Sequence, residues 1–144
     1  MCRSVEKESL VLQPPTDQMR ALVIREPWLA KILAGEKTWD LRDRNALRRG
    51  LIGLIRAGSG QVIGAARLTD THGPFALDEL VDQYEHHGVP QSEFDPRWKF
   101  AWVLSNAVAL SCPVSYDHGS GPVTWIVLKP EVEAAIRAQL TQRA

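Results

Sequence analysis

The chain has 144 residues, of which 44% are hydrophobic and 24% are charged, and this composition predicts one globular domain with an apolar core. Its 17 basic and 17 acidic side chains balance, which excludes binding of nucleic acid by bulk positive charge in the manner of a histone. The only cysteines, Cys2 and Cys112, cannot form the multi-bridge framework of a small secreted protein, so we expect a cytoplasmic location.

Residues 1–19 are expected to form a flexible N-terminal tail, with Met19 as an alternative start, and residues 20–141 to form a single domain. The apolar run at 10–12 is too short for a signal peptide. Because no apolar run reaches the ~18 residues that span a bilayer, we expect no membrane partner.

The domain is expected to begin with a strand at 20–24 and a short helix after Pro27, where apolar residues recur at helical spacing and Gly35 provides a helix end. A strand follows at 37–42. In it Trp39 and Leu41 alternate with polar residues, which predicts one buried face and one face that carries chemistry. Strand alternation places Lys37 on the face of the apolar pair, unless the turn before the strand rotates it.

Two apolar runs at 50–56 and 61–69 surround a Gly-Ser-Gly turn and predict a hairpin. Helical spacing between Leu77 and Tyr84 predicts a helix that Gly88 and Pro90 end.

The C-terminal part is expected to hold a strand pair at 100–104 and 108–116, a strand at 124–128, and a helix starting near Pro130 with Ile136 on its inner face. In total we expect about six or seven strands and three helices. Short strands with inserted helices favour an α+β fold, a mixed β-barrel, over a doubly wound sheet.

Most catalytic patterns are absent from the sequence. There is no Gly-x-Ser-x-Gly nucleophile elbow, and the turn at 58–60 matches neither a P-loop nor a dinucleotide fingerprint. The four histidines lack the spacing of a zinc site, so we expect them on the surface and expect no metal or cofactor. The acidic residues at 79, 82 and 85 fit a solvated helix face.

A basic and aromatic stretch at 25–49 is the main functional signal in this neutral protein. It contains two tryptophans, Trp28 and Trp39. It also contains seven cationic residues: Arg25, Lys31, Lys37, Arg42, Arg44, Arg48 and Arg49. Cations neutralise phosphates and tryptophan stacks on bases, so the stretch suits a nucleic acid or nucleotide. The alternative is that both tryptophans belong to the core and the arginines are ordinary surface charges.

The sequence around this stretch resembles the ASCH domain, the activating signal cointegrator homology domain of the PUA-like superfamily. That family carries Gly-x-Lys-x-x-Glu-x-Arg, and Gly35, Lys37, Asp40 and Arg42 occupy those places. Further similarity lies in the strands at 50–68, in the run Phe-Ala-Trp-Val-Leu at 100–104, and at 113–116 and 124–125.

The resemblance implies a PUA-like barrel with a cleft that binds RNA or a modified nucleoside or nucleotide. Within that cleft, Lys37 and Arg42 would hold phosphate or a base oxygen, and Asp40 would accept a hydrogen bond from a base amine or orient Arg42. The expected ligand-binding residues are Arg25, Trp28, Lys37, Thr38, Asp40, Arg42, Arg44 and Trp98, with Trp98 favoured over Trp102 because it follows Pro96 in a loop.

One branch of this family is an amidohydrolase that deacetylates N4-acetylcytidine, with a motif similar to Lys-Thr-x-Thr-x-Arg. Here Asp40 replaces the second threonine, which is the nucleophile of that branch. An enzyme would therefore use Thr38 as nucleophile or Asp40 as general base, with Lys37 as its partner. Ribonuclease activity is a further alternative, for which no histidine pair lies near the motif in the sequence. We rank binding first, an enzyme second and a protein adaptor third.

Overall fold

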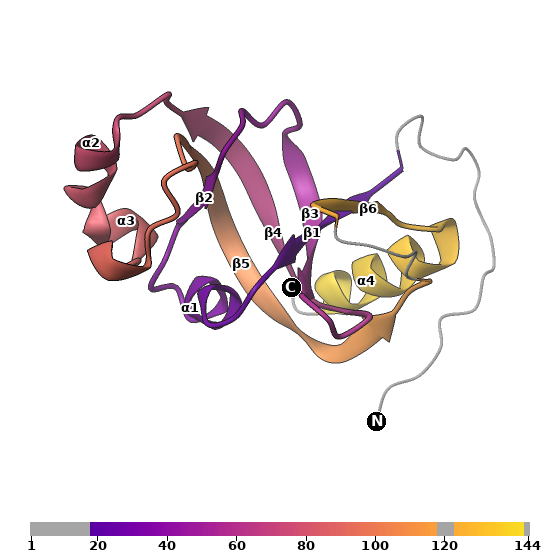
Figure 1. The fold of residues 1–144 in the computed structure, drawn as a ribbon. Helices are drawn as coiled ribbons and strands as arrows, with labels where there is room; N and C mark the ends of the chain where they lie inside the picture. Colours follow the sequence, from indigo (N-terminus) through magenta and orange to yellow (C-terminus); the bar gives the residue numbers. More distant parts are fainter. Residues whose placement is uncertain (1–17, 118–122, 143–144) are drawn as a thin grey trace. The chain divides into compact units, whose positions relative to one another are not determined.

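The computed structural model describes residues 18–117 and 123–142 and contains a six-stranded mixed sheet with the order β2-β5-β4-β3-β1-β6 (Figure 1). The elements, in chain order, are β1 (Arg20–Ile24), α1 (Trp28–Leu33), β2 (Trp39–Arg42), β3 (Gly50–Arg56), β4 (Gln61–His72), α2 (Leu77–Val81), α3 (Tyr84–His87), the 3₁₀ helix η1 (Gln91–Glu93), β5 (Phe100–Ser115), β6 (Trp125–Val127) and α4 (Pro130–Gln142). The α+β class and the mixed sheet are as expected. None of the helices in the described ranges has the length and apolar character needed to cross a membrane.

The described residues group into two compact units, and β3, β4 and β5 each run through both. Unit 1 contains β1, β6, α4 and the parts of these three strands at 52–56, 61–65 and 108–115. Its strand β1 pairs in parallel with β3 and antiparallel with β6. Gly53 permits the first pairing, because a Cβ there would lie 3.1 Å from the Cβ of Ala21.

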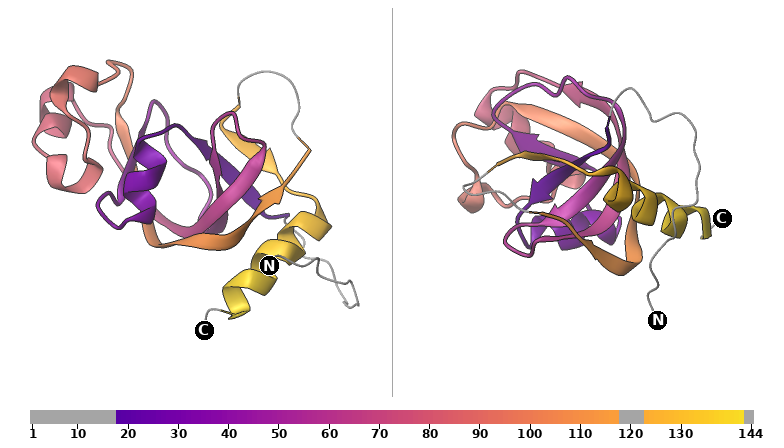
Figure 2. Two further views of the ribbon diagram at one scale, coloured as in Figure 1. Left: turned by 90° about the horizontal axis from the view of Figure 1, so that it is seen from below. Right: turned by 90° about the vertical axis from the view of Figure 1, so that its right-hand side faces the viewer.

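Helix α4 closes unit 1 through contacts with the N-terminal residues and with β5. The Glu133 carboxylate accepts a hydrogen bond from the backbone N–H of Met19 at 3.2 Å, and the Gln139 side chain exchanges two hydrogen bonds with the backbone of Cys112. Figure 2 shows α4 lying beside the orange end of β5. As expected, Ile136 is fully buried. Met19 is also buried and therefore belongs to the fold, whereas the rest of the expected tail, apart from Gln18, lies outside the described residues.

Unit 2 contains α1, β2, α2, α3 and the remaining parts of the long strands. Strand β2 pairs antiparallel with β5, with Asp40 opposite Trp102. A small core forms from buried Leu41, Leu80, Val89 and Ala101, against which five aromatic side chains pack: Trp28, Trp39, Phe75, Phe94 and Trp98. This core holds β2 between α1 and the α2–α3 segment.

Two expected elements differ in the structure. The strand pair expected at 100–104 and 108–116 is one continuous strand, in which Asn106 adopts φ +53°. The helix expected between Leu77 and Tyr84 is divided into α2 and α3, so four α-helices replace the expected three. Gly88 ends α3 in the left-handed conformation, as its position predicted.

Candidate functional site

Lys37 lies between α1 and β2 with its amine buried. Because β2 begins at Trp39, strand alternation does not set the direction of this side chain. Only 3% of the residue is exposed. Its Nζ donates hydrogen bonds to the backbone oxygens of Trp39 and His87 at 2.7 and 2.6 Å, and it lies 5.6 Å from the centre of the Trp28 ring. The expected ligand anchor therefore also fastens α3 to the start of β2.

Burial lowers the pKa of Lys37 to about 8, because an ammonium ion loses its hydration in the protein interior. The Asp40 carboxylate acts in the opposite direction, and the Arg42 guanidinium lowers the pKa further. These influences show that Lys37, Asp40 and Arg42 are electrostatically coupled. The motif expected from the sequence is thus brought together in space.

Asp40 and Arg42 form an ion pair over an indole ring. The Arg42 Nε donates to the Asp40 Oδ2 at 2.5 Å, and the guanidinium carbon lies 5.4 Å from the centre of the Trp102 ring. Asp40 is 5% exposed, although strand alternation predicted that its face of β2 would be open. On that face, Asp40 lies beside its cross-strand neighbour Trp102 and is paired with Arg42. A fifth of the Arg42 side chain remains exposed, so its planar guanidinium is held in place at the surface.

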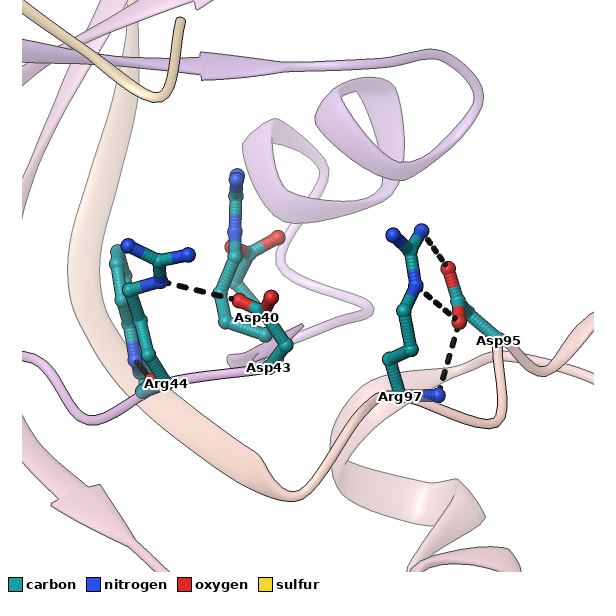
Figure 3. Close-up of polar contacts among 7 residues, drawn as sticks. Asp40, Asp43, Arg44, Asp95 and Arg97 are labelled. Atoms are coloured by element: carbon teal, nitrogen blue, oxygen red, sulfur yellow. Dashed lines mark hydrogen bonds and ion pairs between the residues drawn. The ribbon is translucent and has the colours of Figure 1, made fainter.

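Exposed charged groups surround this ion pair. The Arg44 side chain is 77% exposed and its Nε lies 3.3 Å from Asp43, while its backbone oxygen accepts a hydrogen bond from the Trp102 indole N–H at 2.9 Å. Figure 3 shows Asp43 between Arg44 and Arg97, and Arg97 is itself paired with Asp95 at 2.7 Å. The hydrogen bond from Arg44 lowers the pKa of Asp43, and the charge of Arg97 contributes in the same direction.

The tryptophans expected to stack on a ligand pack mainly within the protein. Trp28 and Trp98 are partly buried against the core of unit 2, and Trp98 contacts Phe94 edge to face at 5.6 Å. Both side chains therefore contribute to this core, and each keeps a partly exposed surface. Trp102 is buried as expected, yet it supports Arg42 directly.

Thr38 and Arg25 are both exposed, and only Thr38 lies in unit 2 with the rest of the motif. The Thr38 backbone joins two elements, since its N–H donates to His86 and its oxygen accepts from Leu104. Arg25 follows β1 directly and is the last residue of the first segment of unit 1.

The expectation of surface histidines is wrong for His87, which is fully buried. Its Nε2 donates to the Leu80 backbone oxygen at 2.6 Å, and its Nδ1 accepts from the Val89 N–H, so the ring is held as one neutral tautomer. Burial correspondingly lowers its pKa. His86 stacks on Trp39 with ring centres 4.5 Å apart, and His72 contacts the same indole at 5.4 Å.

Sequence reasoning missed the roles of His87 and Arg97 beside the motif. His87 is fifty positions from Lys37 and no spacing rule connects them. The helix end at Gly88 was visible in the sequence, but the hydrogen bond between the His87 backbone oxygen and Lys37 depends on how α3 packs. Arg97 directly precedes Trp98, which the sequence analysis named as an expected ligand-binding residue. The loop was therefore predicted as part of the site, although Arg97 itself was not.

Comparison with known proteins identifies the fold. A scan against models of protein families finds no match, and a search of curated proteins finds none either. Among solved structures, the chain is similar to ASCH from Zymomonas mobilis, with 17% sequence identity, a TM-score of 0.65, and coverage of 84% of this chain and 94% of that one. The chain has an ASCH fold.

Two mutant structures of the Zymomonas mobilis ASCH protein give the same result. They match with TM-scores of 0.67 and 0.65 at 16% and 18% identity, and cover 84% and 87% of this chain and 97% and 98% of theirs. The resemblance stated from the Lys37, Asp40 and Arg42 motif is therefore confirmed at the level of the ASCH fold. The match spans most of the chain, in agreement with the spread of the similar segments from Gly35 to position 125.

Proposed function

We propose that this ASCH domain binds RNA, or a modified nucleoside or nucleotide, in the cytoplasm through the group formed by Lys37, Asp40 and Arg42. The observation that supports this most is the Arg42 guanidinium held between the Asp40 carboxylate and the Trp102 ring. A guanidinium fixed in this way is a preorganised donor for a phosphate or for the edge of a base.

The surrounding charges favour an anionic ligand. Arg44 and Arg97 are both largely exposed beside this group. Each is paired with a carboxylate on the surface, where ion pairs contribute little free energy and exchange readily for a phosphate. Thr38 adds an exposed hydroxyl next to the motif. The proposed site thus consists of buried Lys37, of buried Asp40, which holds Arg42 in position, and of the exposed arginines Arg44 and Arg97 beside them.

The first experiment measures binding and turnover in one sample. The purified protein is incubated with N4-acetylcytidine, with other acylated and methylated nucleosides, and with a short RNA, while calorimetry follows binding and chromatography follows products. We expect binding without turnover. Arg44→Gln and Arg97→Gln should each weaken RNA binding without lowering the melting temperature, because both side chains are exposed.

Arg67→Gln provides the matched control, since Arg67 is an exposed arginine on β4 in the same unit. This variant should bind like the wild type. Equal affinities of all three arginine variants for every ligand would contradict the proposal. If Arg42→Gln instead lowers the melting temperature by many degrees with unchanged affinity, Arg42 serves only as a structural ion pair.

An amidohydrolase is the second candidate, and the lowered pKa of Lys37 beside Thr38 favours it. A lysine with a pKa near 8 is partly neutral at physiological pH and can accept a proton. Other contacts favour binding over catalysis. Lys37 donates to two backbone carbonyls and Asp40 accepts from the Arg42 guanidinium, and these contacts stabilise the charged forms of both side chains. Deacetylation of N4-acetylcytidine that is lost in Lys37→Ala would establish the enzyme.

A further inference from the structure

The segment 43–49, which joins β2 to β3, is a basic loop that presents one isolated apolar side chain to solvent. Leu47 is 90% exposed, the highest value among the large hydrophobic residues of the described chain. Arg48 and Arg49 follow it directly, and Arg44 precedes it by three residues. Isolated exposed leucines are common on protein surfaces, so the surroundings of Leu47 have to carry the argument.

The loop is held in a fixed shape. The Trp102 indole N–H binds the Arg44 backbone oxygen, and Ala46 is buried immediately before Leu47. The Nη1 of Arg49 donates to the backbone oxygens of Ala46 and Arg48, both at 2.9 Å. Its other terminal nitrogen lies 3.9 Å from Asp70 on β4. The backbone around Leu47 is therefore held in one conformation by these contacts. The loop loses little conformational entropy when a ligand contacts Leu47.

The loop is also tied to the binding group of the proposed function. Trp102 supports the Arg42 guanidinium on its ring face and the Arg44 carbonyl on its indole nitrogen. Leu47 is five positions after Arg42, so their Cα atoms lie at most about 18 Å apart. Successive bases of a stacked strand are about 3.4 Å apart, so a few nucleotides extend over this distance.

We infer that Leu47 is a wedge that inserts between bases of a single RNA strand whose phosphates contact Arg44, Arg48 and Arg49. This inference rests on the proposed function and specifies its ligand as a polynucleotide. Segment 42–49 contains four arginines and one aspartate, a charge pattern complementary to a phosphate backbone. Proteins that kink duplex DNA insert leucine and similar apolar side chains between base steps, and the same contact is available to the bases of a single strand. A membrane surface requires a broad apolar face, and this loop offers one side chain.

The test compares Leu47→Ala with Leu77→Ala, which removes another exposed leucine from α2 in the same unit. Fluorescence anisotropy measures the affinity of each full-length variant for a labelled single-stranded RNA of twelve nucleotides. Calorimetry measures the affinity for cytidine monophosphate. We expect Leu47→Ala to weaken RNA binding about tenfold, as expected when much of the apolar area of one leucine is no longer buried, without changing the melting temperature. Its affinity for the mononucleotide, and both affinities of Leu77→Ala, should stay at the wild-type values.

Salt dependence gives a second readout. Arg48→Gln should reduce the slope of log affinity against log salt by about one, as expected for the loss of one phosphate contact. RNA binding that is equal in Leu47→Ala and the wild type would overturn the inference. So would Leu47-dependent binding to anionic phosphatidylserine vesicles without binding to RNA. If, in either of these two cases, the mononucleotide still binds in an Arg42-dependent manner, the proposed function stands while the wedge is rejected.

Discussion

Opposing influences on the Lys37 amine determine what the motif can do. Burial favours the neutral amine, whereas two backbone oxygens and the Asp40 carboxylate favour the ammonium ion. The result is a pKa of about 8, which lies within the accessible pH range. The protonation state of Lys37 is therefore a measurable property of the folded protein.

Stability should rise with pH between about 8 and 10.5 because of Lys37. In this window the unfolded chain holds a proton on the lysine that the folded chain has lost, so raising the pH favours the folded state. The full contribution is on the order of 3 kcal/mol. Urea unfolding at pH 8 and pH 10 should show a smaller rise in the free energy of unfolding for Lys37→Met than for the wild type. Identical pH profiles would show that Lys37 has an ordinary pKa.

The sequence identified the residues of the motif but not their environments. Gly35, Lys37, Asp40 and Arg42 were recognised by their spacing, which is a local property. The burial of Asp40 depends on its pairing with Trp102 in β5, and the contact of Lys37 depends on His87 in α3. Both partners are distant in the sequence, so no local pattern contains them.

At the level of elements, His87 joins α2 to the turn after α3. Its two ring nitrogens bind Leu80 and Val89, and both bonds require the neutral ring. Protonation would remove the acceptor at Nδ1 and place a charge in the core. Protonation of His87 would consequently destabilise the α2–α3 segment.

Acid should destabilise the fold through His87. Because burial lowers its pKa in the folded state, its contribution is complete above pH 6.5 and is lost as the pH falls below that value. Thermal unfolding at pH 7 and pH 5 should show a drop in melting temperature that is smaller in His87→Gln, whose amide keeps the donor to Leu80. A drop of equal size in this variant would assign the acid sensitivity to other groups.

The connection from β4 to α2 requires glycine at position 73. Gly73 has φ +130°, and a Cβ there would lie 2.5 Å from the Lys99 backbone oxygen and 2.9 Å from Phe100. Gly73→Ala should therefore destabilise the protein by at least about 1–3 kcal/mol. Gly58→Ala is a control for backbone strain alone, because its φ is +83° and its Cβ would meet no atom within 4 Å. Equal losses in both variants would show that the crowding at Gly73 has no effect.

Elements that depend on a short stretch of sequence were predicted well. Strand β3 has the bounds expected from its apolar run, and β1 and α1 likewise agree. The strand pair expected at 100–104 and 108–116 implied a turn between its two members, yet the chain continues as one strand, in which Asn106 adopts a positive φ. Asparagine tolerates that conformation, so its sequence signal is shared by turns and by bent strands.

At the scale of the whole molecule, stability and binding should be separable. The proposed binding groups belong to unit 2, whereas α4 packs within unit 1. Ile136→Ala removes a fully buried side chain and should lower the free energy of unfolding by about 2–5 kcal/mol. RNA affinity measured well below the melting temperature should remain unchanged. A large loss of affinity in the folded variant would show that α4 influences binding.

The α+β class followed from the pattern of short strands and inserted helices, whereas the ASCH fold in particular was accessible from the sequence only through its resemblance to a family. Identity to the solved ASCH structures is 16–18%, so the recognition rested on the spacing of one motif and on a few short similar segments rather than on overall identity. The strand order depends on pairings between distant segments, such as β1 with β3 and β2 with β5. Hydrophobic periodicity predicts strands, but it does not determine their neighbours.

The parallel pairing of β1 and β3 has a consequence for how such a domain can diversify. Parallel neighbours require a long crossover, and here residues 25–49 form it, including α1, β2 and the loop that carries Leu47. Most of the proposed RNA-binding residues therefore lie in one continuous segment, residues 25–49, between two strands whose register is fixed. We call this segment the cassette. Exchanging this cassette between homologues offers a route to altered ligand preference in a single engineering step.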